Sequence, residues 1–493
     1  MNNGTTYPYE LPKGWVWTRL GDVLGFVKGK KPKNLGTRNN LLTIPYIDIN
    51  AFENEIFDEF TDGDKCPLCQ TDDTLIVWDG ARCGLVGRGV AGAIGSTLAK
   101  LPCFEVNSTY VFYFIQSMYE FINKRPRGVG IPHVEPSVFW NTLIPLSPLP
   151  EQRRVVAKIE ELFTRLDAGV EALKNIKTQL KRYRQSVLKH AFEGKLTAEW
   201  RQAHKEEFEP ASALLDRIKQ ERKKTAKSKY KELPPLDNSN LPELPEGWVW
   251  TVVEDVSILV TKGSTPTSYN FDYVPHGINF IKVENLKNGR VDRASLAEFI
   301  TKDTHAFLKR SQLMKDDILF SIAGTIGKVA IVHSDDLPAN INQAIAIIRC
   351  PWEFVNPDYI KIVFDSEIAR QSIERRPRGV GMNNVSLGDV KNIVFPLPPL
   401  PEQHRIVEEV ERRFSVADQI KKTVDHSLKQ AERLRQSILK HAFEGKLVPQ
   451  DPNDEPAEKL LERIRQERAR QQAERKPAKS SKNKSNTKQM RLV

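Results

Sequence analysis

PLSPLPEQRRVVAKIEELF, residues 145–163, opens the segment of the chain that decides its fold. Beyond this start, apolar residues recur alternately three and four positions apart, which is the spacing of a coiled-coil helix. The stripe consists of Ile159, Leu162, Leu166, Gly169, Leu173, Ile176, Leu180, Tyr183 and Val187. The pattern predicts a helix of roughly 43 residues that ends at the glycine of FEGKL. A helix of that length with a single apolar face requires a partner.

A second copy of this segment lies 251 residues further along the chain. Residues 396–414 match residues 145–163 at 11 of 19 positions, and RLRQSILKHAFEGKLV (433–448) matches RYRQSVLKHAFEGKLT (182–197) at 13 of 16. Its apolar register is weaker and reads Val410, Arg413, Ala417, Ile420, Val424, Ser427, Ala431, Leu434 and Ile438. We expect the two helices to pair antiparallel around a pseudo-two-fold axis. The alternative is that each stripe packs on its own domain or on another protein.

Two further repeats define the organisation of the chain. ELPKGWVWTRLGDV (10–23) recurs as ELPEGWVWTVVEDV (243–256), and LLDRIKQER (214–222) recurs as LLERIRQER (460–468). The regions between these blocks have diverged, which predicts two variable α+β domains of about 140 residues that alternate with helical regions. The predicted boundaries are 1–149 and 246–400 for the variable domains, 150–222 and 401–468 for the helical regions, 223–245 for a basic linker and 469–493 for a basic disordered tail.

Short apolar runs within the variable domains predict their elements. TLIVWDG (74–80) and DILFSIAGTIGKVAIV (317–332) are typical of strands. STYVFYFI (108–115) predicts a strand or a passage from strand to helix. NPDYIKIVFDSEIARQSI (356–373) predicts a helix with Asn356 as its N-cap and a proline in the first turn.

The net charge of the 493-residue chain is +11, but it is unevenly distributed. Residues 217–231 carry +7 and residues 468–493 carry +8, so the remainder sums to −4. These runs either attract phosphate without sequence preference or are solvated segments. No apolar run is long enough for a membrane span, and we expect no secretion signal. Five sparse cysteines favour free thiols in a reducing compartment, which predicts a cytoplasmic protein.

A basic, glycine-rich heptapeptide occurs near the end of each variable domain, as KRPRGVG (124–130) and RRPRGVG (375–381). The proline stiffens the turn and the glycines let backbone N–H groups approach a phosphate, so we predict contacts to a DNA backbone. The alternative is a tight turn that directs the chain into the long helix. The arginines concerned are Arg125, Arg127, Arg376 and Arg378.

Lysine-bearing loops follow the first apolar run of each variable domain, as KGKKPKN (28–34) and KGSTPTS (262–268). Small polar loops of this kind suit reaching into a DNA groove or holding a phosphate. An ordinary surface loop has the same composition, so both interpretations stay open.

Residues typical of catalysis or metal binding form no convincing constellation in the sequence. Asn356-Pro357-Asp358-Tyr359 superficially resembles the catalytic motif of adenine methyltransferases, but Asp358 replaces its second proline. Cys66 and Cys69 form one CxxC pair without a second pair at zinc-finger spacing. His133 has no recognisable partner in the neighbouring sequence, so we expect no catalytic or metal site.

The blocks ELPKGWVWTRLGDV, PLPPLPEQHRIV and RLRQSILKHAFEGKL resemble the specificity subunit of type I restriction–modification enzymes. The resemblance implies two tandem α/β target recognition domains, separated by two long helices that form an antiparallel coiled coil with pseudo-two-fold symmetry. Each domain would bind one half of a bipartite, asymmetric DNA sequence. The alternative function is a coiled-coil adaptor without sequence-specific DNA binding.

The same resemblance implies the partners and cofactors. Double-stranded DNA, two methyltransferase subunits and, through them, restriction subunits would bind the chain, and no membrane would. The chain would be non-catalytic and would bind no cofactor or metal itself. The complex would be an adenine methyltransferase and ATP-dependent endonuclease that uses S-adenosylmethionine, ATP and Mg²⁺ on its other subunits.

The resemblance also assigns the candidate DNA contacts by position. GSTPTS (263–268) and IKVENLKNG (281–289) match the family motifs, whereas GKKP (29–32) and IDINAFENE (47–55) take their places in the first domain. The first domain departs from the pattern because two lysines replace small residues and Asp48 replaces a basic one. With the lysine loops and the heptapeptides predicted above, these motifs give the full set of candidate DNA contacts: Lys28, Lys30, Lys31, Lys33, Lys262, Ser264, Thr265, Lys282 and Asn285, together with the four arginines of the heptapeptides.

Overall fold

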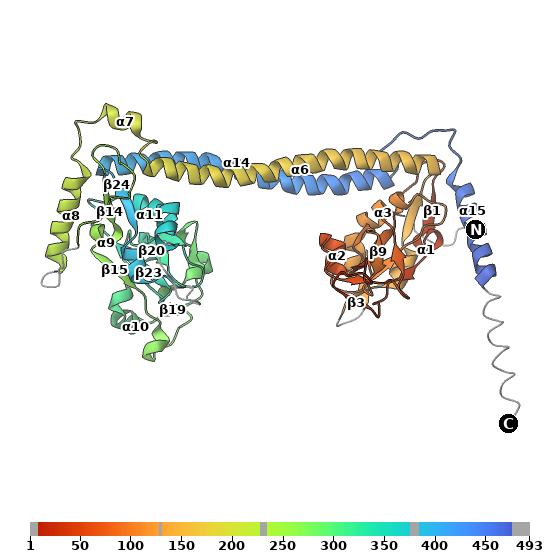
Figure 1. Ribbon diagram of the computed structural model, residues 1–493, viewed down its shortest axis with the longest axis horizontal. Helices are drawn as coiled ribbons and strands as arrows, with labels where there is room; N and C mark the ends of the chain where they lie inside the picture. Colours follow the sequence, from red (N-terminus) through yellow and green to blue (C-terminus); the bar gives the residue numbers. More distant parts are fainter. Residues whose placement is uncertain (1–7, 128–130, 227–233, 375–383, 476–493) are drawn as a thin grey trace, which may run out of the picture. The chain divides into compact units, whose positions relative to one another are not determined.

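The computed structural model describes residues 8–127, 131–226, 234–374 and 384–475 of the chain (Figure 1). The chain divides into two compact units. Unit 1 comprises residues 1–173 and 426–493, and unit 2 comprises residues 174–425. Each unit therefore contains one variable domain and one part of each long helix.

The described part of the variable domain of unit 1 contains four sheets. β1 (Val16–Arg19) pairs antiparallel with β13 (Leu143–Leu146) and so joins the two ends of the domain. A four-stranded sheet has the order β2 (Val27–Lys28), β10 (Leu98–Lys100), β7 (Thr74–Val77), β8 (Val86–Arg88). A five-stranded sheet has the order β3 (Leu35–Gly36), β5 (Phe60–Thr61), β4 (Ile44–Ile47), β9 (Gly92–Ile94), β6 (Leu68–Cys69). β11 (Pro126–Arg127) and β12 (His133–Val134) form a separate two-stranded ribbon.

The variable domain of unit 2 repeats this plan. β14 (Val249–Val252) pairs antiparallel with β24 (Val394–Leu397). A six-stranded sheet has the order β15 (Leu259–Lys262), β23 (Ile345–Arg349), β20 (Ile318–Ser321), β21 (Val329–Ile331), β18 (Gly289–Val291), β17 (Leu286–Lys287). A three-stranded sheet has the order β19 (Phe299–Ile300), β16 (Ile278–Ile281), β22 (Ala339–Ile341).

Other helices accompany the sheets in each unit. In unit 1 they are α1 (Leu20–Val23), α2 (Ile49–Asn54), α3 (Ser108–Ser117), α4 (Tyr119–Asn123), α5 (Pro136–Asn141) and α15 (Ala457–Arg475). In unit 2 they are α7 (Ala198–Ala203), α8 (Ala211–Ala226), α9 (Val253–Val256), α10 (Lys302–Phe307), α11 (Pro357–Asp365), α12 (Glu367–Glu374) and α13 (Leu387–Lys391). Unit 2 also contains the 3₁₀ turns η2 (Pro266–Tyr269), η3 (Val283–Asn285), η4 (Arg293–Ser295), η5 (Lys309–Ser311) and η6 (Ser334–Asp336).

The two long helices are α6 (Leu149–Phe192) and α14 (Leu400–Phe443), each of 44 residues. Each helix ends two residues before the glycine of FEGKL, as the sequence predicts. Gly194 and Gly445 adopt left-handed φ values of 67° and 69°, which terminate a helix at no steric cost only when the residue is glycine.

The long helices run antiparallel. In unit 2, Lys177 Nζ lies 2.9 Å from Asp425 Oδ1, and Arg184 lies 2.5 Å from Asp418. The residue number thus rises by seven along α6 while it falls by seven along α14. In Figure 1 the two helices lie side by side, and the sequence colours advance in opposite directions along them. The predicted antiparallel pairing is confirmed.

Unit 1 repeats one of these contacts with the helices exchanged. Arg435 of α14 pairs with Asp167 of α6, and its guanidinium lies 4.3 Å from the ring centre of Phe163. In unit 2, Arg184 pairs with Asp418 and its guanidinium lies 4.6 Å from the ring centre of Phe414. Corresponding residues differ by 251 positions, so each unit builds the same helix-to-helix contact from the two copies of the repeat.

The predicted apolar stripe is buried only in part. Ile159, Val187, Val410, Ala417, Val424 and Ile438 are buried. Ile176 and Tyr183 of α6 remain 37% and 42% exposed, and Ile420 and Leu434 of α14 remain 42% and 51% exposed. Two helices alone bury a narrow seam, so large side chains at its edges stay open to solvent. The helix pair therefore still presents apolar surface.

A buried glutamate in the first turn of each long helix ties it to the start of a variable domain. In unit 1, Trp15 Nε1 donates to Glu151 Oε2 over 2.9 Å. In unit 2, Trp248 Nε1 donates to Glu402 Oε2 over 2.7 Å. Both carboxyl groups are 1% exposed. The repeated GW dipeptide and the repeated PEQ tripeptide are thus partners in the fold.

A buried tyrosine also recurs. Tyr110 of α3 donates its hydroxyl to Pro145 O over 2.7 Å, and Tyr359 of α11 donates to Pro396 O over 2.6 Å. Both rings are fully buried, and each contacts the phenylalanine that ends a long helix in the same unit. This contact holds each variable domain against the helix pair.

The helices α8 and α15 close the two variable domains. Ala211 N, at the start of α8, donates to Gly247 O over 2.8 Å, and Ala457 N, at the start of α15, donates to Gly14 O over 2.9 Å. The repeated LLDRIKQER and LLERIRQER blocks thus pack on the second and first variable domains, respectively. Figure 1 shows α15 beside α1 and β1 in unit 1, and α8 beside α9 in unit 2.

Of three further predicted elements, one is confirmed and two differ from the structure. Residues 108–115 form helix α3 rather than a strand, with the Asn107 side chain accepting from Tyr110 N. The run is buried on most sides, so its periodicity could not distinguish a strand from a helix. The predicted cap at Asn356 is confirmed, because its side chain accepts from Tyr359 N. α15 continues to Arg475, so residues 469–475 are helical rather than part of a disordered tail.

Candidate nucleic-acid interface

The two lysine-bearing loops have the same backbone geometry. Gly29 N donates to Leu98 O over 2.9 Å, and Gly263 N donates to Ile345 O over 3.2 Å. A Cβ added at either glycine would lie 2.1 Å from a backbone oxygen, so only glycine lets the loop approach its neighbouring strand. The shared framework thus presents residues 30–34 and 264–268 in matching positions.

The side chains of these loops differ in charge and exposure. In unit 1, Lys30, Lys31 and Lys33 are exposed and give the loop a strongly basic surface. In unit 2, Lys262 is exposed, whereas Ser264 and Thr265 are half-buried. Thr265 Oγ1 also hydrogen-bonds Gln343 Oε1. The first loop is therefore suited to phosphate, and the second loop to shorter polar contacts.

The heptapeptide is described in unit 1 only in part. Arg125 and Arg127 are exposed, and the Arg125 guanidinium lies 3.9 Å from the ring centre of Phe121. Arg127 lies in β11, directly opposite His133 of β12. Arg376 and Arg378 of the second heptapeptide lie outside the described residues, so their predicted contacts stay predictions.

The second assigned motif holds its residues in two different environments. Lys282 Nζ pairs with Glu298 and lies 5.3 Å from the ring centre of Tyr273. Asn285 is 3% exposed; its Oδ1 accepts from Lys282 N over 2.8 Å, and its Nδ2 donates to Ser295 O over 2.8 Å. Asn285 therefore positions the loop, and its predicted contact with DNA stays a prediction. Lys282 stays a candidate.

Asp48 of unit 1, which stands in place of the basic residue of the family motif, has a local structural role. Asp48 stands where unit 2 has Lys282, and its side chain accepts from Ala51 N over 2.8 Å. It caps α2, where a carboxylate complements the positive end of the helix dipole. The first domain has thus replaced a basic loop residue by a helix cap.

Sequence reasoning missed a cluster around Asp79. Lys28 Nζ lies 2.5 Å from Asp79 Oδ2, and His133 Nδ1 lies 2.6 Å from Asp79 Oδ1. These residues come from β2, from the loop after β7 and from β12, so no local spacing signals the cluster. His133 is therefore not isolated, and Lys28 is not available to phosphate as a free cation. Two candidate DNA-binding residues flank the Asp79–His133 pair: Lys28 is bonded to Asp79, and Arg127 lies opposite His133 in the β-ribbon.

The cysteines form no metal centre within the described residues. Cys69 Sγ donates to Val90 O over 2.9 Å, and Cys66 Sγ donates to Lys30 O over 3.2 Å. Burial raises the pKa of Cys69 to about 11 and those of Cys103 and Cys350 to about 12. All five cysteines are free, and among the described residues no group of three His, Cys, Asp or Glu side chains could hold a metal ion.

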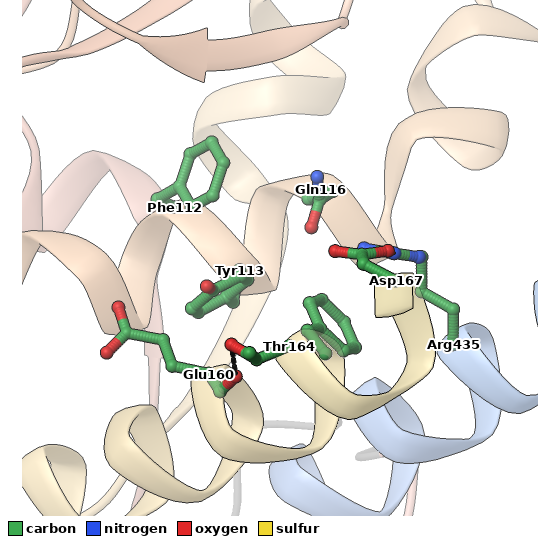
Figure 2. A pocket seen from close by; sticks show the side chains of 8 residues that line it. Phe112, Tyr113, Gln116, Glu160, Thr164, Asp167 and Arg435 are labelled. Atoms are coloured by element: carbon green, nitrogen blue, oxygen red, sulfur yellow. Dashed lines mark hydrogen bonds and ion pairs between the residues drawn. The ribbon is translucent and has the colours of Figure 1, made fainter. Parts of the chain in front are cut away.

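A pocket of about 300 Å³ lies between α3 and the helix pair in unit 1 (Figure 2). Its lining is Phe112, Tyr113, Gln116, Glu160, Phe163, Thr164, Asp167 and Arg435. Burial and the nearby Glu160 carboxylate raise the pKa of Tyr113, so its phenol stays neutral. Asp167 and Arg435 pair with each other, and Thr164 donates to Glu160 O over 2.8 Å. These two contacts lie within the helix pair, whereas Tyr113 of α3 packs edge-on against Phe163 of α6, with ring centres 5.6 Å apart, and so joins the variable domain to the helices. The lining includes no activated nucleophile.

The helices of the described ranges give no candidate for a membrane span, since none combines the required length and apolar composition. Both variable domains match the model of a known protein family. A model of the type I restriction modification DNA specificity domain matches residues 12–182 and 245–430. The chain belongs to this family. Each specificity domain thus includes one variable domain and part of the long helix that follows it.

Relatives of this specificity protein span most of its length. The type I restriction enzyme EcoBI specificity subunit of Escherichia coli is 31% identical over 412 residues, which cover 81% of this chain and 80% of the relative. The EcoKI specificity subunit of E. coli strain K12 is 28% identical over 499 residues, which cover 93% of this chain and 97% of the relative. The predicted resemblance and the two recognition domains of a specificity subunit are confirmed.

A solved specificity-like fold supports the architecture. A chain from a study of complex assembly and conformational transition of the type I R-M system aligns with a TM-score of 0.60 at 21% identity. The alignment covers 89% of this chain and 100% of that chain. At this identity the likeness concerns the fold, namely two mixed domains with two long paired helices.

Proposed function

We propose that the chain reads a bipartite, asymmetric DNA sequence, with one half-site bound by each recognition domain. One observation carries this proposal: the two units repeat the same framework but present unlike side chains from matching loops. Exposed Lys30 and Lys31 in unit 1 correspond to Ser264 and Thr265 in unit 2. Equal scaffolds with unequal loops suit two unequal half-sites, because base readout depends on the side chains that reach the grooves.

The helix pair supports a second part of the proposal, a spacer of constant length. Two domains related by a pseudo-two-fold would meet successive major grooves of one duplex, about one helical turn apart. The bases between the half-sites would be spanned without being read. Antiparallel helices suit this role since neither helix can slide without breaking the Arg184–Asp418 and Lys177–Asp425 pairs.

The chain itself would be non-catalytic, and its partners would supply the chemistry. We expect two methyltransferase subunits, which bind S-adenosylmethionine, and restriction subunits that use ATP and Mg²⁺. Methylation requires the target adenine to leave the base stack, and the methyltransferase partner would perform that step. The partly exposed stripe of Ile176, Ile420 and Leu434 offers apolar surface to such subunits.

A domain exchange tests the proposal. Residues 248–396 are replaced by the corresponding residues of a relative with a known site, and modified adenines are mapped by single-molecule sequencing in a host that carries the chimaera. The expected result is a change of one half-site, with the other half-site and the spacer retained. A change in both half-sites would contradict independent reading.

The basic loop of unit 1 offers a second test. Combined Lys30→Ala and Lys31→Ala substitutions should weaken binding to site-bearing and random duplexes alike and reduce the salt dependence by about two counterions. The exposed Lys421 of α14 provides a control, since its substitution by alanine should leave both quantities unchanged. Unchanged binding by the Lys30/Lys31 variant would remove this loop from the DNA surface.

A coiled-coil adaptor without sequence-specific DNA binding is the second candidate, and the exposed apolar residues of the helices favour it. It predicts that the chain, alone or with methyltransferase subunits, binds a site-bearing duplex no better than a random duplex. Competition between these two duplexes in a mobility-shift experiment therefore separates the two functions.

A further inference from the structure

The cluster of Lys28, Asp79 and His133 lies on the surface of the first recognition domain. The side chains are 34%, 25% and 44% exposed, respectively. Asp79 uses both carboxylate oxygens, one for the lysine at 2.5 Å and one for the imidazole at 2.6 Å. The three residues come from β2, from the loop after β7 and from β12, and Asp79 forms a β-bridge with His133. The imidazole is therefore held in a defined orientation with nearly half of its surface open to solvent.

The contact with Asp79 fixes which ring nitrogen of His133 faces outward. A carboxylate only accepts hydrogen bonds, so the proton lies on Nδ1, the nitrogen that faces Asp79. The other nitrogen, Nε2, is an acceptor when the imidazole is neutral and a donor when it is protonated. The same side chain can thus meet either a base-edge amino group or an anionic oxygen.

Four charged groups surround His133, each from a different element. Asp79 comes from the loop after β7, Lys28 from β2 and Arg127 from the opposing strand β11. Glu135 follows β12 and accepts from the Ser137 hydroxyl over 2.8 Å and from Ser137 N over 3.2 Å. These two bonds and, to a smaller extent, the nearby Arg127 lower the pKa of its carboxyl group. The positive charges of Lys28 and Arg127 balance the negative charges of Asp79 and Glu135. Protonation of His133 therefore gives this group of side chains a net positive charge.

The second recognition domain lacks this cluster. Val134 N donates to Trp78 O over 2.9 Å, and Val385 N donates to Ile322 O over 2.8 Å, which identifies these positions as equivalent. The residues that follow Trp78 and Ile322 are Asp79 and Ala323. The residues that precede Val134 and Val385 are His133 and Asn384. Neither Ala323 nor Asn384 ionises.

We propose that His133, oriented by Asp79, contacts the DNA of the first half-site through Nε2 and takes up a proton when it does so. The proposal rests on the proposed function, because it requires this face of the first domain to meet DNA. The lysine loop that begins at Lys28 and the arginine of β11 border the cluster on two sides, so a bound duplex would bring its phosphates to the imidazole. A polyanion favours the protonated ring, which donates from both nitrogens.

The proton couples DNA binding to pH. Imidazole changes its charge between about pH 5 and pH 8, so binding through the cationic ring strengthens as pH falls through that range. For one proton taken up per complex, the affinity should rise by at most about tenfold per pH unit. The second domain, with Asn384 in place of the histidine, adds no such dependence.

The test measures the affinity of the full chain with its methyltransferase subunits by fluorescence anisotropy across this pH range. The probes are a duplex that carries the site defined by adenine mapping and a random duplex of the same length. The expected result is that His133→Asn, which installs the residue of the second domain, removes the rise in affinity toward low pH. His133→Gln is a second variant, and the thermal melt of each variant at each pH shows that the fold is retained.

Two variants of the second domain sharpen the test. Asn384→His alone should add no pH dependence, because Ala323 supplies no carboxylate to orient the ring. Ala323→Asp combined with Asn384→His should add it. Identical pH profiles for the wild type, His133→Asn and His133→Gln would overturn this inference, while a retained preference for the site-bearing duplex would leave the proposed function standing. Loss of that preference in the wild type at every pH would instead contradict the proposed function.

Discussion

The two recognition domains share a framework and differ in the loops that it carries. In both domains an indole N–H donates to a buried glutamate of a long helix, and a buried tyrosine donates to a proline carbonyl. The loops at equivalent positions carry Asp79 and His133 in one domain and Ala323 and Asn384 in the other. The blocks of sequence that repeat are therefore those that build the framework, and the residues that have diverged are those that we propose to read different DNA.

The framework itself is unequal at one point. Glu402 accepts from Trp248 Nε1, Thr197 Oγ1 and Arg201, each over 2.7 Å. Glu151 accepts only from Trp15 in the described structure, and its Oε1 is buried without a partner. Val448 stands at the position of Thr197 in the second copy of the repeat and cannot donate a hydrogen bond. The same buried carboxylate is thus well satisfied in unit 2 and poorly satisfied in unit 1.

The largest expected effect is the loss of stability when each buried glutamate is replaced by alanine. Glu402→Ala should destabilise unit 2 by about 3–5 kcal/mol, because it leaves an arginine that is only 20% exposed and a buried indole N–H without their acceptor. Glu151→Ala should cost unit 1 only about 1–2 kcal/mol. Denaturant unfolding, followed by hydrogen exchange in each unit, measures both values. Equal losses would show that the orphaned oxygen has no energetic consequence.

A smaller effect follows from the charge on Glu151. Burial raises the pKa of this carboxyl group above its ordinary value. The folded state therefore holds the proton more tightly than the unfolded state, and unit 1 loses stability as pH rises from the ordinary glutamate pKa through the raised value. Glu151→Gln removes the charge and keeps an acceptor for Trp15, so it should stabilise unit 1 at neutral pH by about 1 kcal/mol. A stability profile with the same pH dependence in the variant and the wild type would contradict this.

The buried tyrosines should behave alike. Tyr110→Phe and Tyr359→Phe each remove one hydroxyl and leave one buried proline carbonyl without its donor. We expect each substitution to cost its own unit about 1–1.5 kcal/mol. Thermal denaturation of the two variants compares them directly, and a difference above about 1 kcal/mol would show that the two units do not share this part of the framework.

The smallest expected effect concerns the helix pair. Asp167–Arg435 and Asp418–Arg184 are equivalent ion pairs with partly exposed side chains. Because solvent screens such pairs, each coupling energy should stay below about 1 kcal/mol, and the two values should agree. Double-mutant cycles with alanine measure both couplings. A large coupling in one unit alone would show that the helices pair differently in the two units.

Sequence predicted the long helices because their signals are local and repeated. The three-and-four spacing from Ile159 to Val187 specifies the helix, and the repeat supplies its partner. The pairing of Asn356 with Tyr359 N is likewise a contact three residues long. The strand prediction for residues 108–115 was wrong. Tyr110, Val111 and Phe112 are all buried, so no exposed polar face revealed the helical period in the sequence.

The candidate site was less predictable because its contacts are not local. His133 and Asp79 lie 54 residues apart, and only the folding of the β11–β12 ribbon against the loop after β7 brings them together. Asn285 matched a motif by position, but a motif does not report whether a side chain is exposed or buried. The exposure of Lys30, Lys31 and Lys33 was predictable, because charged residues beside a glycine favour a surface loop.

The most direct test of two unlike reading domains is a hydroxyl-radical footprint of the full chain with its methyltransferase subunits on a site-bearing duplex. We predict two protected tracts with an unprotected spacer between them. In the Lys30→Ala/Lys31→Ala variant, protection should weaken in one tract only. A single continuous tract, or equal weakening of both tracts in that variant, would contradict separate reading of the two halves.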